Sequence, residues 1–179
     1  MIAATHDLFG DPIALSQALI RQPTVNPCHD GAQDVLAQVL ESIGFRTKRY
    51  HFEGVDNLYA RFGSEQPNFC FSGHTDVVPV DGQDWSSNPF ELIARGDKYY
   101  GRGTCDMKGF IATALALVPL FKAARLKRPI HLALSCDEEV GCKGVRPLVA
   151  HMRDHLPKPR AVIVGEPTSM KVVNGHKSA

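Results

Sequence analysis

Four short clusters of acidic and imidazole side chains carry the chemistry that this sequence suggests. They are His74-Thr75-Asp76, Asp106 within the segment 101–109, Asp137-Glu138-Glu139, and Glu166 before Pro167. Each cluster follows a run that reads as a β-strand or lies on the turn into a helix, and open α/β sheets bind ligands at strand ends. Oxygen and nitrogen donors without cysteine suit Zn²⁺, Co²⁺ or Mn²⁺. The clusters therefore predict a hydrolase that uses two metal ions.

The first two clusters each allow a simpler explanation. His74 and Asp76 are two residues apart, so both side chains point to one side if the strand continues through them. A neutral imidazole binds zinc and usually donates its other ring N–H to a carboxylate, a role that Asp76 can fill. The alternative is a histidine that only makes hydrogen bonds. For Asp106, the alternative to a carboxylate that bridges two metals is an ordinary helix N-cap.

The third and fourth clusters place acids directly after apolar strands. The run Asp137-Glu138-Glu139 is unfavourable unless cations or solvent compensate its charges. One interpretation is a solvated acidic loop. The other is that one glutamate binds a metal ion while its neighbour acts as the general base that deprotonates a water molecule. Glu166 needs a partner at its strand end, which a metal, a turn N–H or a lysine could provide.

The elements that must position these clusters follow from periodicity and helix breakers. The sequence predicts four helices: one that starts at Asp11-Pro12 and ends before Pro23, and others over 32–43, 108–125 (with a bend near Pro119) and 145–155. It predicts strands over 45–52, 57–62, 68–73, 130–136, 161–164 and 170–174. Residues 79–97 are predicted to be a loop. The later alternation of helices and strands predicts an α/β fold, a three-layer sheet with helices on both faces.

The overall composition excludes several classes of protein. The chain has 179 residues, enough for one substantial domain, and its hydrophobic content of 44% is ordinary. A net charge of +1 gives no indication of nucleic acid or an anionic membrane as partner. Five cysteines without a C-x-x-C pair argue against a disulfide framework. Together with an N-terminus unlike a signal peptide, they lead us to expect a cytoplasmic protein.

Five stretches around the clusters resemble the M20 family of di-zinc metallopeptidases and deacylases. They are residues 71–80, 85–90, 100–110, 134–142 and 164–168. The resemblance implies a zinc-peptidase-like catalytic domain that hydrolyses the amide of a small N-acyl amino acid. The expected substrate is N2-acetyl-L-ornithine, from which acetate is removed in arginine biosynthesis. Succinyl-diaminopimelate and peptides are the alternative substrates.

The resemblance also assigns a role to each residue of the clusters. It implies that His74 and Glu166 hold one zinc, that Asp106 bridges both zinc ions, and that Glu139 holds the second, with Co²⁺ able to substitute for zinc. Glu138 would be the general base, and Asp76 would support His74. The same resemblance implies a cis peptide bond between Asp106 and Met107.

The resemblance has a further implication for domain organisation. Residues 1–179 correspond to the N-terminal part of the catalytic domain. A lid and dimerisation domain, and the closing part of the catalytic domain with a last histidine ligand, have no counterpart in them. The intact enzyme would be a homodimer through that lid domain. The alternative from another class is a fragment that binds metal without turnover.

Overall fold

The computed structural model describes residues 8, 10–26, 31–63, 69–124 and 129–175. Its helices are α1 (Pro12–Ile20), α2 (Gly31–Ser42), α3 (Lys108–Ala116), α4 (Val118–Ala123) and α5 (Val145–His155). Its strands are β1 (Arg46–Phe52), β2 (Val55–Phe62), β3 (Phe69–His74), β4 (Ile93–Arg95), β5 (Lys98–Tyr100), β6 (Ile130–Ser135) and β7 (Ala161–Val164). No helix in these ranges is long and apolar enough to cross a membrane.

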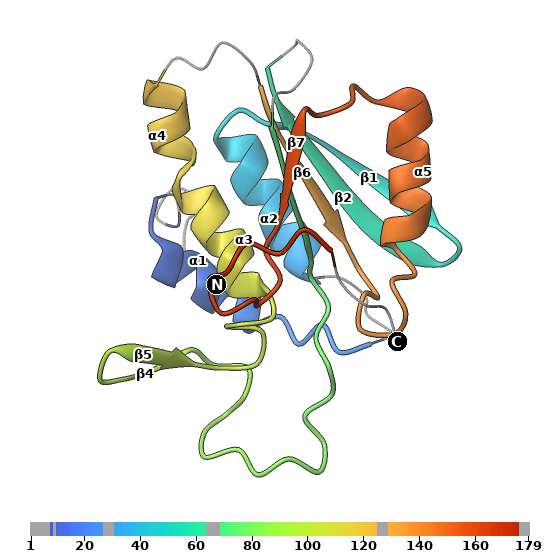
Figure 1. Ribbon diagram of the computed structural model, residues 1–179. Helices are drawn as coiled ribbons and strands as arrows, with labels where there is room; N and C mark the ends of the chain where they lie inside the picture. The colour runs from blue at the N-terminus through green and yellow to red at the C-terminus, as the bar shows by residue number, and fades with distance from the viewer. Residues whose placement is uncertain (1–7, 9, 27–30, 64–68, 125–128, 176–179) are drawn as a thin grey trace.

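The centre of the fold is a five-stranded sheet with the strand order β1-β2-β6-β3-β7. Strands β1, β2 and β6 pair antiparallel, whereas β3 pairs parallel with both β6 and β7. Helices α1 to α4 lie on one side of this sheet and α5 lies on the other (Figure 1). The predicted three-layer α/β architecture is therefore confirmed.

The two faces of the sheet are covered by apolar clusters of different size. On the side of α1 to α3, the helices pack on the sheet through a large apolar core. Its fully buried members include Leu15, Leu36, Leu58, Leu115 and Leu132. On the α5 side a smaller cluster contains Tyr50, Tyr59, Cys70, Ala133 and Leu148. Strand β6 is buried on both faces, which is typical of a central strand in an α/β sheet.

Local signals explain where the first helix begins and how it is joined to the site. Asp11 caps α1, because its Oδ1 accepts from the N–H groups of Ile13 at 2.8 Å and Ala14 at 3.1 Å. At the other end of α1, the buried Lys108 ammonium donates to the carbonyl oxygens of Leu19 at 3.1 Å and Gln22 at 2.7 Å. Lys108 thereby ties the C-terminus of α1 to the first turn of α3.

The structure corrects three predictions about elements. Residues 93–100, inside and after the predicted loop, form the β4–β5 hairpin. The helix predicted as one bent element is two, α3 and α4, which meet at Leu117 because Pro119 cannot donate a backbone hydrogen bond. No strand forms over 170–174, since Ser169 and Met170 have positive φ and the chain turns there. The predicted ends at Asn68 and Arg125 lie outside the described residues.

The sequence argued against a disulfide framework, and the structure contains one disulfide-bonded cysteine among the described residues. Cys70, Cys105 and Cys142 are free, whereas Cys136 is disulfide-bonded. A disulfide at the end of β6 was not predicted, because an odd number of cysteines without a close pair does not indicate which of them meet.

Candidate metal centre

Parallel pairing brings three of the four clusters to one edge of the sheet. In the register of β3 with β6, His74 is paired with Ser135, and in that of β3 with β7, Ser72 is paired with Val164. The turn that contains Glu138 and Glu139 therefore follows β6 beside His74, and Glu166 follows β7 on the other side. The carboxyl ends of parallel strands are where α/β sheets bind ligands.

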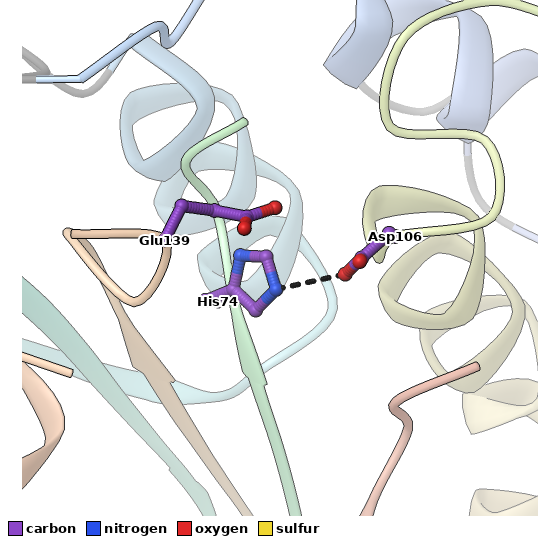
Figure 2. Close-up of side chains that lie close together, drawn as sticks. All are labelled: His74, Asp106 and Glu139. Carbon is purple, nitrogen blue, oxygen red and sulfur yellow. Dashed lines mark hydrogen bonds and ion pairs between the residues drawn. The ribbon is translucent and has the colours of Figure 1, made fainter. Parts of the chain in front are cut away.

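His74 lies at the centre of the cluster. Its side chain is only 1% exposed. Its Nδ1 lies 3.0 Å from the backbone oxygen of Asp76. Because a carbonyl oxygen can only accept, Nδ1 carries the proton in that hydrogen bond, and Nε2 faces the carboxylates. Nε2 lies 3.0 Å from Asp106 Oδ1 and 3.5 Å from Glu166 Oε1. Figure 2 shows the imidazole between Asp106 and Glu139.

Asp76 is fully buried and does more than support His74. Its Oδ1 lies 3.4 Å from His74 Nδ1, in keeping with the expected supporting role. The same carboxylate also accepts from the backbone N–H groups of Glu138 and Glu139, each at 3.1 Å. Burial would raise the pKa of Asp76, but its interaction with His74, a hydrogen bond from Asn26 and these two backbone hydrogen bonds outweigh burial and lower the pKa. Asp76 is thus an ionised anchor for the acidic turn.

Asp106 is held at the start of α3 by a tight turn. The helix begins at Lys108 with Met107 in the cap position, so the simple capping explanation for Asp106 does not apply. Gly109 allows the turn to pack on the helix, because a Cβ there would lie 2.2 Å from the backbone oxygen of Thr104. The Asp106–Met107 peptide bond is cis, as the resemblance implies. This turn presents the Asp106 carboxylate to His74.

The acidic turn splits its three side chains between the interior and the site. Asp137 has a φ of 57° and is 7% exposed, so it is not part of a solvated acidic loop. Glu138 and Glu139 are half-buried and face the cluster. Glu138 Oε2 lies 4.0 Å from His74 Nε2, and its Oε1 accepts a hydrogen bond from the Cys142 thiol at 3.2 Å.

Two groups of side chains have ligand atoms within 4.8 Å of one another, a spacing at which one ion can be held. They are His74 with Asp106 and Glu139, and His74 with Glu138 and Glu166. The structure thus brings together all five side chains that we expected at the centre. Its groups differ from the assignment implied by the resemblance, in which Glu166 joins Asp106 and Glu138 is not a ligand. Those individual roles remain predictions.

The electrostatics of the cluster fit a divalent cation. Burial alone would lower the pKa of His74, but Asp76 and the other carboxylates raise it to about 9. Burial raises the pKa of Glu139, and the charge of Asp106 raises it further. Burial also raises the pKa of Glu166, which His74 partly offsets. Five carboxylates surround one imidazole and repel one another, and divalent cations would relieve that repulsion.

A pocket adjoins the cluster on the side of Asp106. It is lined by Val78, Gly101, Arg102, Gly103, Thr104, Cys105, Asp106 and Glu139. Two of the candidate ligands, Asp106 and Glu139, line this pocket.

Sequence reasoning missed two residues that contact the cluster. Asn26 donates to both Asp76 and Asp137, and Cys142 donates to Glu138. For Cys142, the spacing of four residues from Glu138 in a turn was the available signal. For Asn26 no local signal existed, because its partners lie 50 and 111 residues away.

Comparison with known proteins identifies the family. The pattern described as "Peptidase family M20/M25/M40" matches residues 70–175, which contain every candidate ligand. The chain belongs to this family. A succinyl-diaminopimelate desuccinylase of Caulobacter sp. (strain K31) is 44% identical over 169 residues, covering 91% of this chain and 42% of the relative. An acetylornithine deacetylase of Pasteurella multocida is 37% identical over 175 residues, covering 92% and 45%.

Solved structures show the same fold. An M20 family metallo-carboxypeptidase of Sulfolobus solfataricus has a TM-score of 0.77 at 21% identity, over 87% of this chain and 37% of its own. Human carnosine dipeptidase 1 has a TM-score of 0.73 at 23% identity, over 88% and 39%. The chain spans less than half the length of the curated relatives it matches, between 42% and 45% of the two above.

Proposed function

We propose that this chain forms the metal-binding part of an amidohydrolase that removes an acyl group from the amino nitrogen of a small amino acid. The observation that supports this most strongly is the convergence of His74, Asp106, Glu138, Glu139 and Glu166 at one sheet edge. M20 peptidases are metal-dependent hydrolases, and the donor set here is the oxygen and nitrogen set that such an activity requires.

The side chains divide the reaction between them. Two divalent cations, when bound, would activate a water molecule and polarise the carbonyl of the scissile amide. Glu138 takes a proton from the attacking water and returns it to the leaving amine nitrogen. Cys142 holds one carboxylate oxygen of Glu138 by its thiol hydrogen bond, and the other oxygen faces the cluster. Asp76 keeps His74 in the tautomer whose Nε2 is directed at the cluster.

The residues expected to hold the cations are His74, Asp106, Glu139 and Glu166. Zn²⁺ is our first choice because carboxylate and imidazole donors suit it, and Co²⁺ accepts the same donors. Glu138 is geometrically able to join His74 and Glu166. If Glu138 is a metal ligand, substituting it should lower the metal content. If Glu138 is only the general base, the metal content should stay unchanged.

The acyl group and the amino acid are the next part of the proposal. From the sequence we expected N2-acetyl-L-ornithine. The succinyl-diaminopimelate desuccinylases compared with the chain are 40–44% identical to it, against 37% for the acetylornithine deacetylase. Succinyl-diaminopimelate is therefore at least as well supported. Both substrates carry an acyl group on one amino group of a diamino acid, and that shared chemistry is what we propose.

Metal analysis and two substrate assays test the proposal. The purified 179-residue chain is dialysed against Zn²⁺, its metal is counted by mass spectrometry, and release of free amine from both substrates is followed. We expect at least one bound zinc per chain, and little or no turnover if a further histidine ligand is needed. A chain that binds no zinc at neutral pH would contradict the proposal. Rapid turnover would confirm the hydrolase and show that these residues suffice.

A further inference from the structure

Asn26 belongs to a segment that is firmly docked beside the cluster. The Thr24 hydroxyl donates to the backbone oxygen of Thr75 at 2.5 Å, and the N–H of Val77 donates to the oxygen of Thr24 at 3.0 Å. Val25 and Val77 form an isolated parallel bridge. The backbone of this segment therefore runs alongside residues 75–77, and these hydrogen bonds fix the position from which the Asn26 side chain extends.

The side-chain amide of Asn26 bridges two buried carboxylates. Its Nδ2 lies 2.8 Å from Asp76 Oδ2 and 2.7 Å from Asp137 Oδ1. Asp76 is fully buried and Asp137 is 7% exposed. Acceptors on both sides require the amide nitrogen rather than its oxygen to face them. One NH₂ group thus provides a donor to each of two carboxylates that would otherwise repel each other in a water-poor environment.

The two bridged carboxylates hold the acidic turn in different ways: Asp76 binds its backbone N–H groups, and Asp137 is itself a residue of the turn. Asp76 accepts from the N–H groups of Glu138 and Glu139, as described above. Asp137 is the first residue of the same turn, and its backbone oxygen accepts from the N–H of Lys143 at 3.0 Å. A shift of either carboxylate would therefore move Glu138 and Glu139 relative to His74.

We propose that Asn26 is a positioning residue of the metal centre: by bridging Asp76 and Asp137 it fixes the turn that presents Glu138 and Glu139. The inference rests on the proposed function for the roles of those two glutamates, whereas the bridge itself is a geometric feature of the chain. A simpler role would be to attach the N-terminal segment to the sheet. The two roles can be separated, because Thr24 in the same segment makes a buried hydrogen bond that does not involve the acids.

The first test measures the turn directly in the metal-free protein. Amide hydrogen exchange at Glu138 and Glu139 is followed by NMR in wild type, Asn26→Ala, Asn26→Ser and the control Thr24→Val. We expect exchange at these two amides to rise roughly fivefold or more in Asn26→Ala, since one hydrogen bond of the network is worth about that factor. Asn26→Ser, which can donate to one acid but not to both, should be intermediate and keeps the test open if the alanine variant does not fold.

The control decides between positioning and attachment. Thr24→Val should leave exchange at Glu138 and Glu139 near the wild-type rate, even where it lowers the melting temperature. Equal acceleration in Thr24→Val and the Asn26 variants would overturn the proposal in favour of simple attachment. Unchanged exchange in both Asn26 variants would overturn it as well.

The second test uses Co²⁺ as the probe. Affinity is measured by calorimetry, and the visible absorption of bound Co²⁺ reports its ligands. Substituting a residue that orients metal ligands typically costs 10- to 100-fold in affinity, so we expect roughly tenfold weaker binding and an altered spectrum in Asn26→Ala. Wild-type affinity and spectrum in that variant would contradict the inference. If the wild-type chain binds no Co²⁺, the proposed function fails, while the exchange rates still decide the role of Asn26.

Discussion

Glu138 and Glu139 are adjacent in the chain but have different surroundings. The backbone N–H groups of both residues are held by the Asp76 carboxylate. Both side chains group with His74, Glu138 together with Glu166 and Glu139 together with Asp106, but Glu138 also accepts a hydrogen bond from the Cys142 thiol. A side chain with a neutral donor on one oxygen and the cluster on the other is placed to exchange a proton. This difference in contacts is what separates a base from a ligand in our proposal.

Substitution of Glu138 tests that division. In a form of the protein that turns over substrate, Glu138→Gln should lower kcat by roughly 10²- to 10⁴-fold, because the general base is lost. Zinc content should stay at the wild-type level, whereas Glu139→Gln, the matched control, should lose zinc. Mass spectrometry and steady-state kinetics measure both effects. Zinc loss in Glu138→Gln would instead identify Glu138 as a ligand.

His131 predicts a pH dependence that is independent of the metal centre. It is fully buried on the α5 side, hydrogen-bonded to the Tyr59 hydroxyl, and burial and the charge of Arg61 lower its pKa to about 4. The unfolded chain, with a pKa of about 6.5, binds a proton that the folded chain does not. Stability should therefore fall as the pH drops from 6.5 to 4, by at most about 1.4 kcal/mol per pH unit from this residue.

Urea unfolding of wild type and His131→Gln across this pH range measures the contribution. The variant should be less stable at pH 7 but should show a shallower decline toward pH 4, since it has no imidazole to protonate. Parallel pH profiles for the two proteins would mean that His131 is not neutral in the folded state. Below pH 4 the two curves should run parallel, because His131 is then protonated in both folded and unfolded chains.

At the scale of elements, the sequence predicted best where periodicity and packing agree. Helix α5 and strand β7 have the predicted bounds, because their patterns are clear and flanked by breakers. A strand was predicted over 170–174, yet Met170 and Val172 are fully exposed to solvent there. The β4–β5 hairpin was missed because three-residue strands leave too little pattern to detect.

The candidate site was predictable for a related reason. Three of its four clusters follow parallel strands, which deliver their carboxyl ends to one edge, and the fourth, with Asp106, lies on the turn into α3. The Asn26 bridge was not predictable in this way. It depends on how the segment before α2 docks beside residues 75–77, which is decided by tertiary contacts rather than by local pattern.

The turn before α3 provides a prediction at this scale. Gly109→Ala places a methyl group against the backbone oxygen of Thr104, so the turn that carries Asp106 must shift. We expect a loss of about 1–3 kcal/mol in stability from this overpacking, together with weaker metal binding. Gly175→Ala is the control, because open space surrounds that position. Thermal unfolding and zinc titration measure the two effects, and a fully wild-type Gly109→Ala protein would contradict the role of the close approach.

At the scale of the whole molecule, β7 is an uncovered edge. Val162, Ile163 and Val164 are 50%, 45% and 57% exposed, and β7 pairs only with β3 among the described strands. Exposed apolar edge strands promote association between chains. We expect the isolated 179-residue chain to self-associate with increasing concentration, as sedimentation velocity would show.

A charge on this edge should reverse that behaviour. Val162→Lys is expected to shift the chain toward monomer, because a lysine on an edge strand opposes strand pairing. Leu120→Lys on α4, also at an exposed apolar position, is the control and should have little effect. Monomeric behaviour of the wild-type chain at all concentrations would show that the β7 edge does not promote association between chains.

The position of β3 between β6 and β7 has a consequence for the order of folding. His74, Glu139 and Glu166 meet only after two parallel pairings have closed long stretches of chain, and such pairings form slowly. A cation held by side chains that follow different strands of this sheet would therefore bind after the rate-limiting step. Zinc should then slow unfolding without accelerating refolding. Stopped-flow measurements with and without zinc should therefore show lower unfolding rate constants but unchanged refolding rate constants in the chevron plot.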